Sequence, residues 1–212
     1  MTGTIHIVDD EETIRDALAF LFASRGMTAI GWPSGEAFLE AQPLDDCACI
    51  ILDVRMQGLS GPEVFERLRA MGSDAPVIFL TGHADVPVAV STLKAGAFDF
   101  VEKPFNDNQI VDLAREATAR FVKRRVETRE ADSIARKIRS LSAREAEVME
   151  RMIDGKLNKQ IAGELGIAIR TVEVHRGRVL AKIGAGNAAD LARLVSPLLP
   201  VLGALRQEAG EA

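Results

Sequence analysis

Five polar residues stand at the ends of short apolar runs, where their side chains could act together. In chain order these residues are Asp9, Asp10, Asp53, Thr81 and Lys103. Short apolar runs that alternate with helical patterns predict a parallel sheet, and the carboxyl ends of its strands form the ligand crevice. Adjacent carboxylates repel one another, and a hard cation such as Mg²⁺ offsets that repulsion while keeping water ligands. Three acids, a hydroxyl group and an ammonium group at one edge are therefore typical of a site for Mg²⁺ and a phosphoryl group.

Each of these residues also has an ordinary structural explanation. Aspartate is common after a strand because it favours turns and caps helices. What favours a functional site is the complete set, in this order and always at the end of a run. A carboxylate can attack a phosphoryl group, and such transfer depends mainly on positioning and on neutralisation of charge. A metal ion and Lys103 could supply much of that neutralisation.

The elements that must position these residues follow from the apolar pattern. The expected strands include residues 5–8, 47–52, 76–80 and 98–102. Apolar residues then recur at helical spacing, and the expected helices cover residues 35–41, 61–71, 86–95 and 106–122, after a first helix that carries Ile14, Leu18, Leu21 and Phe22. Five strand–helix units predict an α/β fold with a doubly wound, five-stranded parallel sheet.

Four short motifs carry a resemblance to a known family. They are Val8–Glu11, Leu52–Met56, Leu80–His83 and Glu102–Phe105. Together they resemble the receiver domain of bacterial two-component response regulators, and the resemblance covers residues 1–122. It implies a flavodoxin-like fold. It also implies a domain that catalyses only its own phosphorylation and dephosphorylation, so the chain is not expected to be an enzyme with an external substrate.

The resemblance also implies a role for each residue of the site. Asp53 would accept the phosphoryl group from a sensor histidine kinase, and Lys103 and Thr81 would bind that group. Thr81 would also act with Phe100 as the switch. The implied ligands of Mg²⁺ are Asp9 (through water), Asp10, Asp53 and the backbone carbonyl of Arg55.

Some residues around the site depart from the family pattern or surround its opening. Gln57 stands where a proline usually follows the Arg-Met pair, and we expect this change to loosen the loop while leaving the Arg55 carbonyl in place. Phe100 occupies the position of the aromatic switch residue but has no hydroxyl group, so a hydrogen-bonded outer position is not available to it. Arg55 and His83 flank the site and are expected to tune the access of water.

Charge divides the chain into two halves. Residues 1–122 carry 9 Lys and Arg against 19 Asp and Glu, a net charge of −10, whereas residues 123–212 carry 17 against 12, a net charge of +5. An acidic half followed by a basic half predicts that the second half binds nucleic acid. We therefore expect a receiver over 1–122, a helical linker over 123–140 and a DNA-binding domain over 141–205.

The linker lacks helix breakers. No Pro or Gly occurs between residues 105 and 154, which excludes a flexible Gly/Ser linker. A helix is expected, either solvated and alone or paired with its copy in a dimer, and the sparse apolar stripe does not decide between these alternatives.

Length and hydropathy agree with two packed domains outside the membrane. The chain has 212 residues, more than the usual single domain, and 47% of them are hydrophobic. No apolar run approaches the ~20 residues of a membrane span, and the N-terminus lacks a signal pattern. We expect a cytoplasmic protein with no membrane partner.

The two cysteines lie in one strand-like run. Cys47 and Cys49 are two residues apart, so their side chains should point to the same side of the strand, into the core. A zinc site needs four ligands, so we interpret both as buried thiols with no metal or redox role.

The basic half shows clear helix boundaries. Ser142–Glu145 is a capping box, and Asn158 is expected to cap the following helix. Gly166 would make the tight turn before a third helix over 169–183. A fourth helix near 187–196 completes an all-α unit.

Two runs in this half carry a second resemblance. Leu157–Ala162 and Arg170–Arg176 resemble the helix-turn-helix of LuxR-type DNA-binding domains. Behind a receiver, this arrangement resembles the NarL/FixJ family and is most similar to its FixJ branch. The third helix would then read the major groove of an operator. The candidate DNA-binding residues are Lys159, Arg170, Thr171, Glu173, Val174, His175, Arg176, Gly177, Arg178 and Lys182.

These candidates divide by chemistry. Glu173, Val174 and Gly177 should face outward to the bases, where Glu accepts from cytosine and Val contacts a thymine methyl group. The basic residues Lys159, Arg170, Arg176, Arg178 and Lys182 suit phosphate contacts. His175 could contact DNA or pack against the second helix. Ala168 stands where a capping Ser or Thr usually begins the recognition helix, so the start of that helix should fray.

These features predict a phosphorylation-dependent transcription regulator. Phosphorylation at Asp53 would draw Thr81 and Lys103 inward and let Phe100 follow. The face around Val88–Lys94 and 98–102 would then form a homodimer that places two helix-turn-helix units on one operator. The expected partners are a sensor histidine kinase, double-stranded DNA and a second copy of the chain, with RNA polymerase as a further candidate.

Two alternatives come from other classes of protein. Phosphatases of the haloacid-dehalogenase type also use a strand-end Asp and Mg²⁺, but they need a second Asp where this chain has Arg55. The other alternative is a DNA-binding protein whose receiver is controlled by protein contact or is always dimeric. Absence of Mg²⁺-dependent phosphorylation would favour that second alternative.

Overall fold

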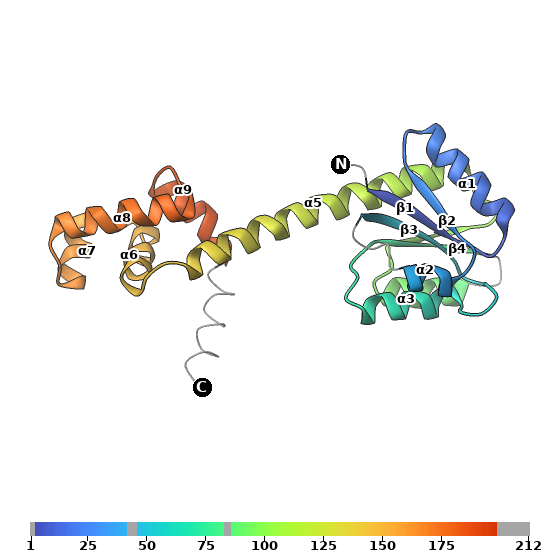
Figure 1. Ribbon diagram of the computed structural model, residues 1–212, viewed down its shortest axis with the longest axis horizontal. Coiled ribbons are helices and arrows are strands. Elements are labelled where there is room, and N and C mark those ends of the chain that lie inside the picture. Colours follow the sequence, from blue (N-terminus) through green and yellow to red (C-terminus); the bar gives the residue numbers. More distant parts are fainter. Residues whose placement is uncertain (1–2, 42–45, 83–85, 199–212) are drawn as a thin grey trace. The chain divides into compact units, whose positions relative to one another are not determined.

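The chain forms two compact units, which are described separately. The computed structural model describes residues 3–41, 46–82 and 86–198 (Figure 1). The first unit spans Met1–Arg125 and the second spans Val126–Ala212. Helix α5 (Asp107–Arg139) contributes residues to both units.

The first unit is built on one parallel sheet. Its strands are β1 (Thr4–Val8), β2 (Ala29–Trp32), β3 (Cys47–Asp53), β4 (Val77–Thr81) and β5 (Asp99–Glu102). Within the described residues the order is β2-β1-β3-β4-β5, and every neighbouring pair is parallel. The predicted doubly wound α/β fold is confirmed, because this order is the flavodoxin-like one.

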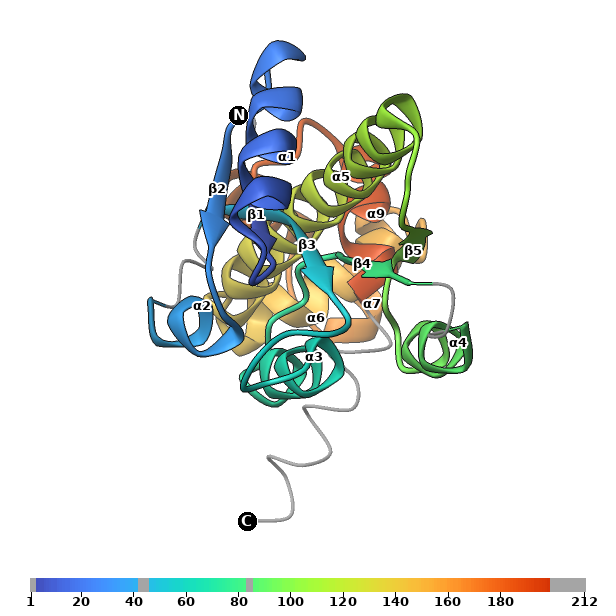
Figure 2. The same ribbon diagram turned by 90° about the vertical axis from the view of Figure 1, so that its right-hand side faces the viewer.

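Helices cover both faces of the sheet. They are α1 (Glu12–Ser24), α2 (Gly35–Ala41), α3 (Gly61–Ala70), α4 (Val86–Lys94) and the first part of α5. Figure 2 shows α1 and α5 on one face, with α2, α3 and α4 on the other. Each face has its own core of buried apolar side chains. The central strand β3 is buried along its whole length, as a strand covered on both faces must be.

The two cysteines do not point to the same side, and that prediction is wrong. Both are buried free thiols, but Cys49 packs in the core under α1 and α5, whereas Cys47 packs in the core under α2 and α3. The cause is a register shift in the pairing of β1 with β3: Thr4 pairs with Cys47 and Ile5 pairs with Cys49. Such an irregularity inserts one residue and reverses the alternation of side chains. Burial raises the pKa of Cys47 to about 12 and raises that of Cys49 as well, so both are unreactive thiols.

The second unit is all-α, as predicted. Its helices are α6 (Ala143–Ile153), α7 (Asn158–Leu165), α8 (Ile169–Ile183) and α9 (Ala188–Val195), followed by the 3₁₀ turn η1 (Ser196–Leu198). Gly166 ends α7 with a φ of 64°, which makes the tight turn before α8. The core holds Met149, Val172, Val179 and Ile183, the inward residues of α6 and α8.

The helix starts in this unit bear out one prediction and correct another. Ser142 and Glu145 form the expected capping box: Ser142 Oγ accepts from the Glu145 N–H at 3.3 Å, and Glu145 Oε2 accepts from the Ser142 N–H at 2.8 Å. Asn158 is not the cap of α7, because the helix already begins at Asn158 and the cap position is Leu157. The Leu157 N–H instead donates to Gln160 Oε1 at 2.8 Å, so the Gln three residues on satisfies it.

The end of α5 belongs to the core of the second unit. Ile138 is only 7% exposed there, and Ile134 packs against the same cluster. Lys137 Nζ donates to the carbonyl of Ile183 at 2.8 Å, at the C-terminus of α8. Lys182 Nζ in turn donates to the carbonyl of Ser140 at 3.3 Å, just after the end of α5. Each lysine therefore satisfies a carbonyl at the end of the other helix, where positive charge is favourable.

Candidate phosphoacceptor site and nucleic-acid interface

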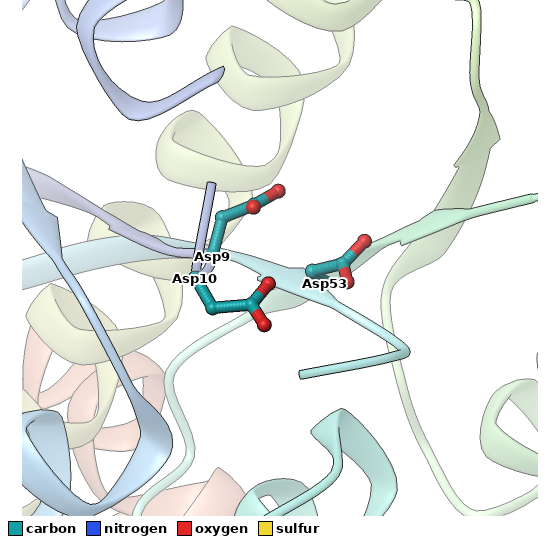
Figure 3. Close-up of side chains that lie close together, drawn as sticks. All are labelled: Asp9, Asp10 and Asp53. Atoms are coloured by element: carbon teal, nitrogen blue, oxygen red, sulfur yellow. The ribbon is translucent and has the colours of Figure 1, made fainter. Parts of the chain in front are cut away.

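Three carboxylates meet where the order of the strands reverses. Asp9 and Asp10 follow β1, and Asp53 is the last residue of β3, the neighbouring strand. Ligand oxygens of all three lie within 4.8 Å of one another (Figure 3). The reversal point between β1 and β3 is where ligands bind in sheets of this type. Asp9 is fully buried, Asp53 is 6% exposed, and Asp10 is open to solvent.

Lys103 provides the positive charge opposite these acids. Its ammonium group lies 2.8 Å from Asp9 Oδ2 and 2.8 Å from Asp53 Oδ1. Burial raises the pKa of Asp53, and the hydrogen bond and charge of Lys103 oppose that rise without cancelling it. Partial burial alone would lower the pKa of Lys103, but its hydrogen bonds to Asp53 and Asp9 outweigh burial and raise it. The ammonium group therefore stays charged beside Asp53.

Thr81 and Phe100 lie on the two strands beside the acids. Thr81 ends β4 and is 1% exposed, and its carbonyl accepts from the Lys103 N–H at 2.7 Å. Phe100 on β5 pairs in register with Phe79 on β4 and packs, half-buried, against the core under α3. His83, which was expected to flank the site, lies outside the described residues, as do residues 199–205 of the expected DNA-binding domain.

Backbone amides hold the acids in place. Asp9 Oδ1 accepts from the Glu11 N–H at 2.9 Å, and Asp53 Oδ2 accepts from the Arg55 N–H at 3.0 Å. Asp10 Oδ2 accepts from the Gln57 N–H at 3.0 Å, across the gap between the two loops. Each acid thus keeps one oxygen engaged with the backbone, which orients the carboxylate towards the shared site.

Arg15 was not among the residues predicted for this site, but it lies beside the acids. Arg15 Nη1 donates to the carbonyls of Asp9 at 2.8 Å and Asp10 at 3.0 Å, so it braces the corner that carries both acids. Its position one turn into the helix that follows the Asp pair is the only signal in the sequence. Its hydrogen-bond partners are backbone carbonyls, which every residue has, so the residue types in the sequence do not reveal them.

The set of donors fits a hard divalent cation. Such cations prefer oxygen ligands, and Mg²⁺ in particular combines one or two carboxylates with water and phosphate oxygens. Asp10 faces solvent and is free of Lys103, and Asp53 has one oxygen towards the shared space. The residues therefore suit a metal ion, and the coarse prediction of a metal site agrees with the structure.

The predicted DNA-binding residues lie mainly on the outer surface of α8. Val172 is buried, while Glu173, Val174 and Gly177 are exposed, as expected for the side that would face DNA. Lys159, Arg170, Thr171 and Arg178 are exposed as well. No side chain caps α8 at Ala168, in agreement with the absence of a Ser or Thr there.

Three candidates on α8 are placed differently. His175 is half-buried, and its Nδ1 is buried without a hydrogen-bond partner among the described residues; Arg176 is half-buried as well. Lys182 is exposed, but its Nζ is paired within the domain, 2.6 Å from Glu145 Oε2. The hydrogen bond from Lys182, together with the Ser142 backbone, lowers the pKa of Glu145 to about 2. This geometry favours a structural role for Lys182 in joining α8 to the start of α6.

The fold and the site together define a receiver domain followed by a helix-turn-helix domain. A family model described as the response regulator receiver domain matches residues 5–115. A second model, described as bacterial regulatory proteins of the luxR family, matches residues 139–195. In the described residues, no helix has the length and apolar content needed to cross a membrane.

The chain belongs to the response regulators of the NarL/FixJ family. It is 61% identical over 196 residues to the C4-dicarboxylate transport transcriptional regulatory protein DctR of Rhodobacter capsulatus, covering 92% of this chain and all of that protein. It is 41% identical to the transcriptional regulatory protein FixJ of Bradyrhizobium diazoefficiens, covering 91% and 94% of the two chains. The structure of the response regulator StyR matches 93% of this chain and all of its own, with a TM-score of 0.85 and 36% identity. The protein is therefore a transcriptional regulator of the two-component type, and the phosphatase alternative is not supported.

Proposed function

We propose that the receiver accepts a phosphoryl group on Asp53 and thereby controls DNA binding by the second unit. The observation that carries this proposal is the position of Lys103, whose ammonium group lies 2.8 Å from both Asp9 and Asp53. One oxygen of Asp53 attacks the phosphorus of a phosphohistidine on the sensor kinase. The new O–P bond forms as the donor's P–N bond breaks, and the departing imidazole keeps the electron pair and takes up a proton.

The residues of the site divide the work of this transfer. Asp10, Asp53, Asp9 through water and the backbone carbonyl of Arg55 would hold Mg²⁺, which supplies positive charge to the phosphoryl oxygens. Lys103 would leave Asp9 and pair with the phosphoryl group, since a dianion attracts it more strongly than a single carboxylate does. Thr81 would donate its hydroxyl to the same group. The protein then needs no external substrate beyond its phosphoryl donor.

The switch is proposed to act through α4 and β5. Movement of Thr81 and Lys103 towards the phosphoryl group leaves space into which Phe100 can turn from its half-buried position. The surface of α4 and β5 includes Val90, which is 44% exposed although it is apolar. We propose that this surface forms the homodimer and that residues 123–140 connect it to the DNA-binding domain as a helical linker.

A measurement of mass in solution tests the proposed function. With Mg²⁺ and beryllofluoride, which imitates a phosphoryl group on Asp53, the full chain should change from monomer to dimer in light scattering. Beryllofluoride without Mg²⁺ is the control and should leave the monomer unchanged. The same mass under all conditions would contradict phosphorylation-dependent dimerisation and favour control by a partner protein.

Operator binding is proposed to use the exposed surface of α8. Val174 is 48% exposed, and Glu173 and Gly177 lie on the same surface, so these positions would meet base edges. Arg170, Thr171, Arg178 and Lys159 are exposed around it and would contact phosphates. His175 and Arg176 lie at the edge of the interface, where DNA could supply the partner that His175 Nδ1 lacks.

Two substitutions on α8 should separate affinity from specificity. Arg170→Ala removes one phosphate contact, so the slope of log K against log salt should fall by about 0.9 while all sequences are bound more weakly. Val174→Ala should leave this slope unchanged and reduce the preference for the operator over other DNA. Fluorescence anisotropy over a series of salt concentrations measures both. An unchanged slope for Arg170→Ala would remove that residue from the interface.

The similarity to DctR suggests which genes to test first. That relative is named for the regulation of C4-dicarboxylate transport, and its 61% identity extends over both units of this chain. We propose that this chain also regulates the uptake of C4-dicarboxylates. The phosphorylated protein should shift the promoter of such a transport operon from its own genome and not an unrelated promoter.

A further inference from the structure

Three amides of one loop donate to three carboxylates from different elements. The loop follows β3, and its N–H donors alternate along the chain: Arg55 donates to Asp53 Oδ2 at 3.0 Å and Gln57 donates to Asp10 Oδ2 at 3.0 Å. The third donor is Leu59, whose N–H donates to Glu36 Oε1 of α2 at 2.9 Å. Hydrogen bonds from its own backbone and from the Leu59 N–H lower the pKa of Glu36, so its carboxylate is charged when it accepts this bond. The loop is therefore anchored at every second residue by a hydrogen bond.

The middle anchor depends on which residue stands at position 57. A proline, which the family pattern usually has here, carries no backbone N–H and could not donate to Asp10. Any residue other than proline could donate this bond, because the donor is the backbone N–H. The Gln57 side chain is exposed and takes no part in it. Asp10 is the acid of the cluster that is open to solvent, and within the described residues no cation of the chain is paired with its carboxylate. Its orientation therefore depends on the bond from Gln57.

We propose that the backbone N–H of Gln57 is a positioning group that orients the Asp10 carboxylate for a divalent cation and ties the loop carrying Arg55 to it. This inference rests on the proposed function, which requires a cation at the cluster. One oxygen of Asp10 is occupied by the N–H, and the other is left to the cation. Hydrogen bonds to ligating side chains fix their orientation, and their loss usually weakens metal binding by about 10–100-fold. Gln57 thus compensates through its backbone for the absence of the proline, which would stiffen the loop.

Direct titration with Mg²⁺ tests this inference without any reaction. Calorimetry on the full chain should give a dissociation constant for Gln57→Pro that is about 10-fold higher than that of the wild type. Gln57→Ala keeps the N–H and loses only the exposed side chain, so it is the matched control and should bind Mg²⁺ as the wild type does.

The outcomes separate the inference from the proposed function. If the wild type binds no Mg²⁺, the proposed function fails and the inference fails with it. If the wild type binds and Gln57→Pro binds equally or more tightly, only the inference is overturned. Weakened binding by Gln57→Ala would assign the effect to the side chain and also overturn it.

Hydrogen exchange gives a test that does not depend on the folding of Gln57→Pro. In the wild type the Gln57 amide should be protected from exchange, and Asp10→Ala should remove that protection while leaving the Leu59 amide, bonded to Glu36, protected. Equal protection of Gln57 in both proteins would show that the bond to Asp10 does not hold the amide.

Discussion

Asp53→Asn will give a folded protein that accepts no phosphoryl group. Asparagine has nearly the same shape but is a much weaker nucleophile, because its side chain carries no negative charge. Incubation with acetyl phosphate and Mg²⁺ should therefore leave this variant unshifted on a phosphate-affinity gel. Dimerisation should be lost with it, and apparent operator affinity should stay about 100-fold below that of the phosphorylated wild type, because the gain from binding two half-sites together is lost.

The stability of this variant separates loss of chemistry from loss of fold. Burial raises the pKa of Asp53, so at neutral pH the charged carboxylate destabilises the native state relative to the unfolded chain. Replacing it with a neutral amide removes this cost, and Lys103 retains its ion pair with Asp9. Thermal unfolding should thus occur at the same temperature as in the wild type or a higher one.

Asp112→Asn provides the matched control for Asp53→Asn. Asp112 is exposed on α5, away from the cluster, so removing its charge should leave phosphorylation and dimerisation as in the wild type. A phosphoprotein formed by Asp53→Asn would contradict the assignment of the phosphoacceptor.

The sequence predicts those parts of the molecule that depend on residue types along the chain. The proximity of Asp9, Asp10 and Asp53 was predictable, because the carboxyl ends of parallel strands meet at one edge of the sheet. The capping box of Ser142 was also predictable, because both of its partners lie within one turn of a helix.

Contacts that depend on pairing or on the backbone were missed. Cys47 and Cys49 face opposite cores because β1 and β3 pair with a shifted register, which the alternation within one strand does not reveal. The bond from Gln57 to Asp10 uses a backbone N–H, so the residue type at position 57 indicated only that a proline is absent. Lys182 is a phosphate-binding candidate by type, but its partner Glu145 lies 37 residues away in the sequence and is brought close only by the fold.

The end of the linker helix should be essential to the stability of the DNA-binding unit. A fragment that begins at Val126 contains the complete second unit, whereas one that begins at Leu141, the start of the domain expected from the sequence, lacks Ile138 and Lys137. The side chain of Ile138 alone is expected to contribute about 2–5 kcal/mol, since it is buried among apolar residues. This is a large part of the free energy of unfolding of a small domain, which is roughly 5–15 kcal/mol.

Urea unfolding of the two fragments, followed by circular dichroism, tests this expectation. The fragment from Val126 should unfold in one cooperative transition, and the fragment from Leu141 should unfold at much lower urea or be unfolded from the start. Arg129→Ala in the longer fragment is the control, because Arg129 is exposed on the same helix and should not matter. Equal urea midpoints for the two fragments would show that the end of the linker helix does not stabilise the DNA-binding unit. A large difference would mean that the linker and α8, joined through Lys137 and Ile183, fold as one unit.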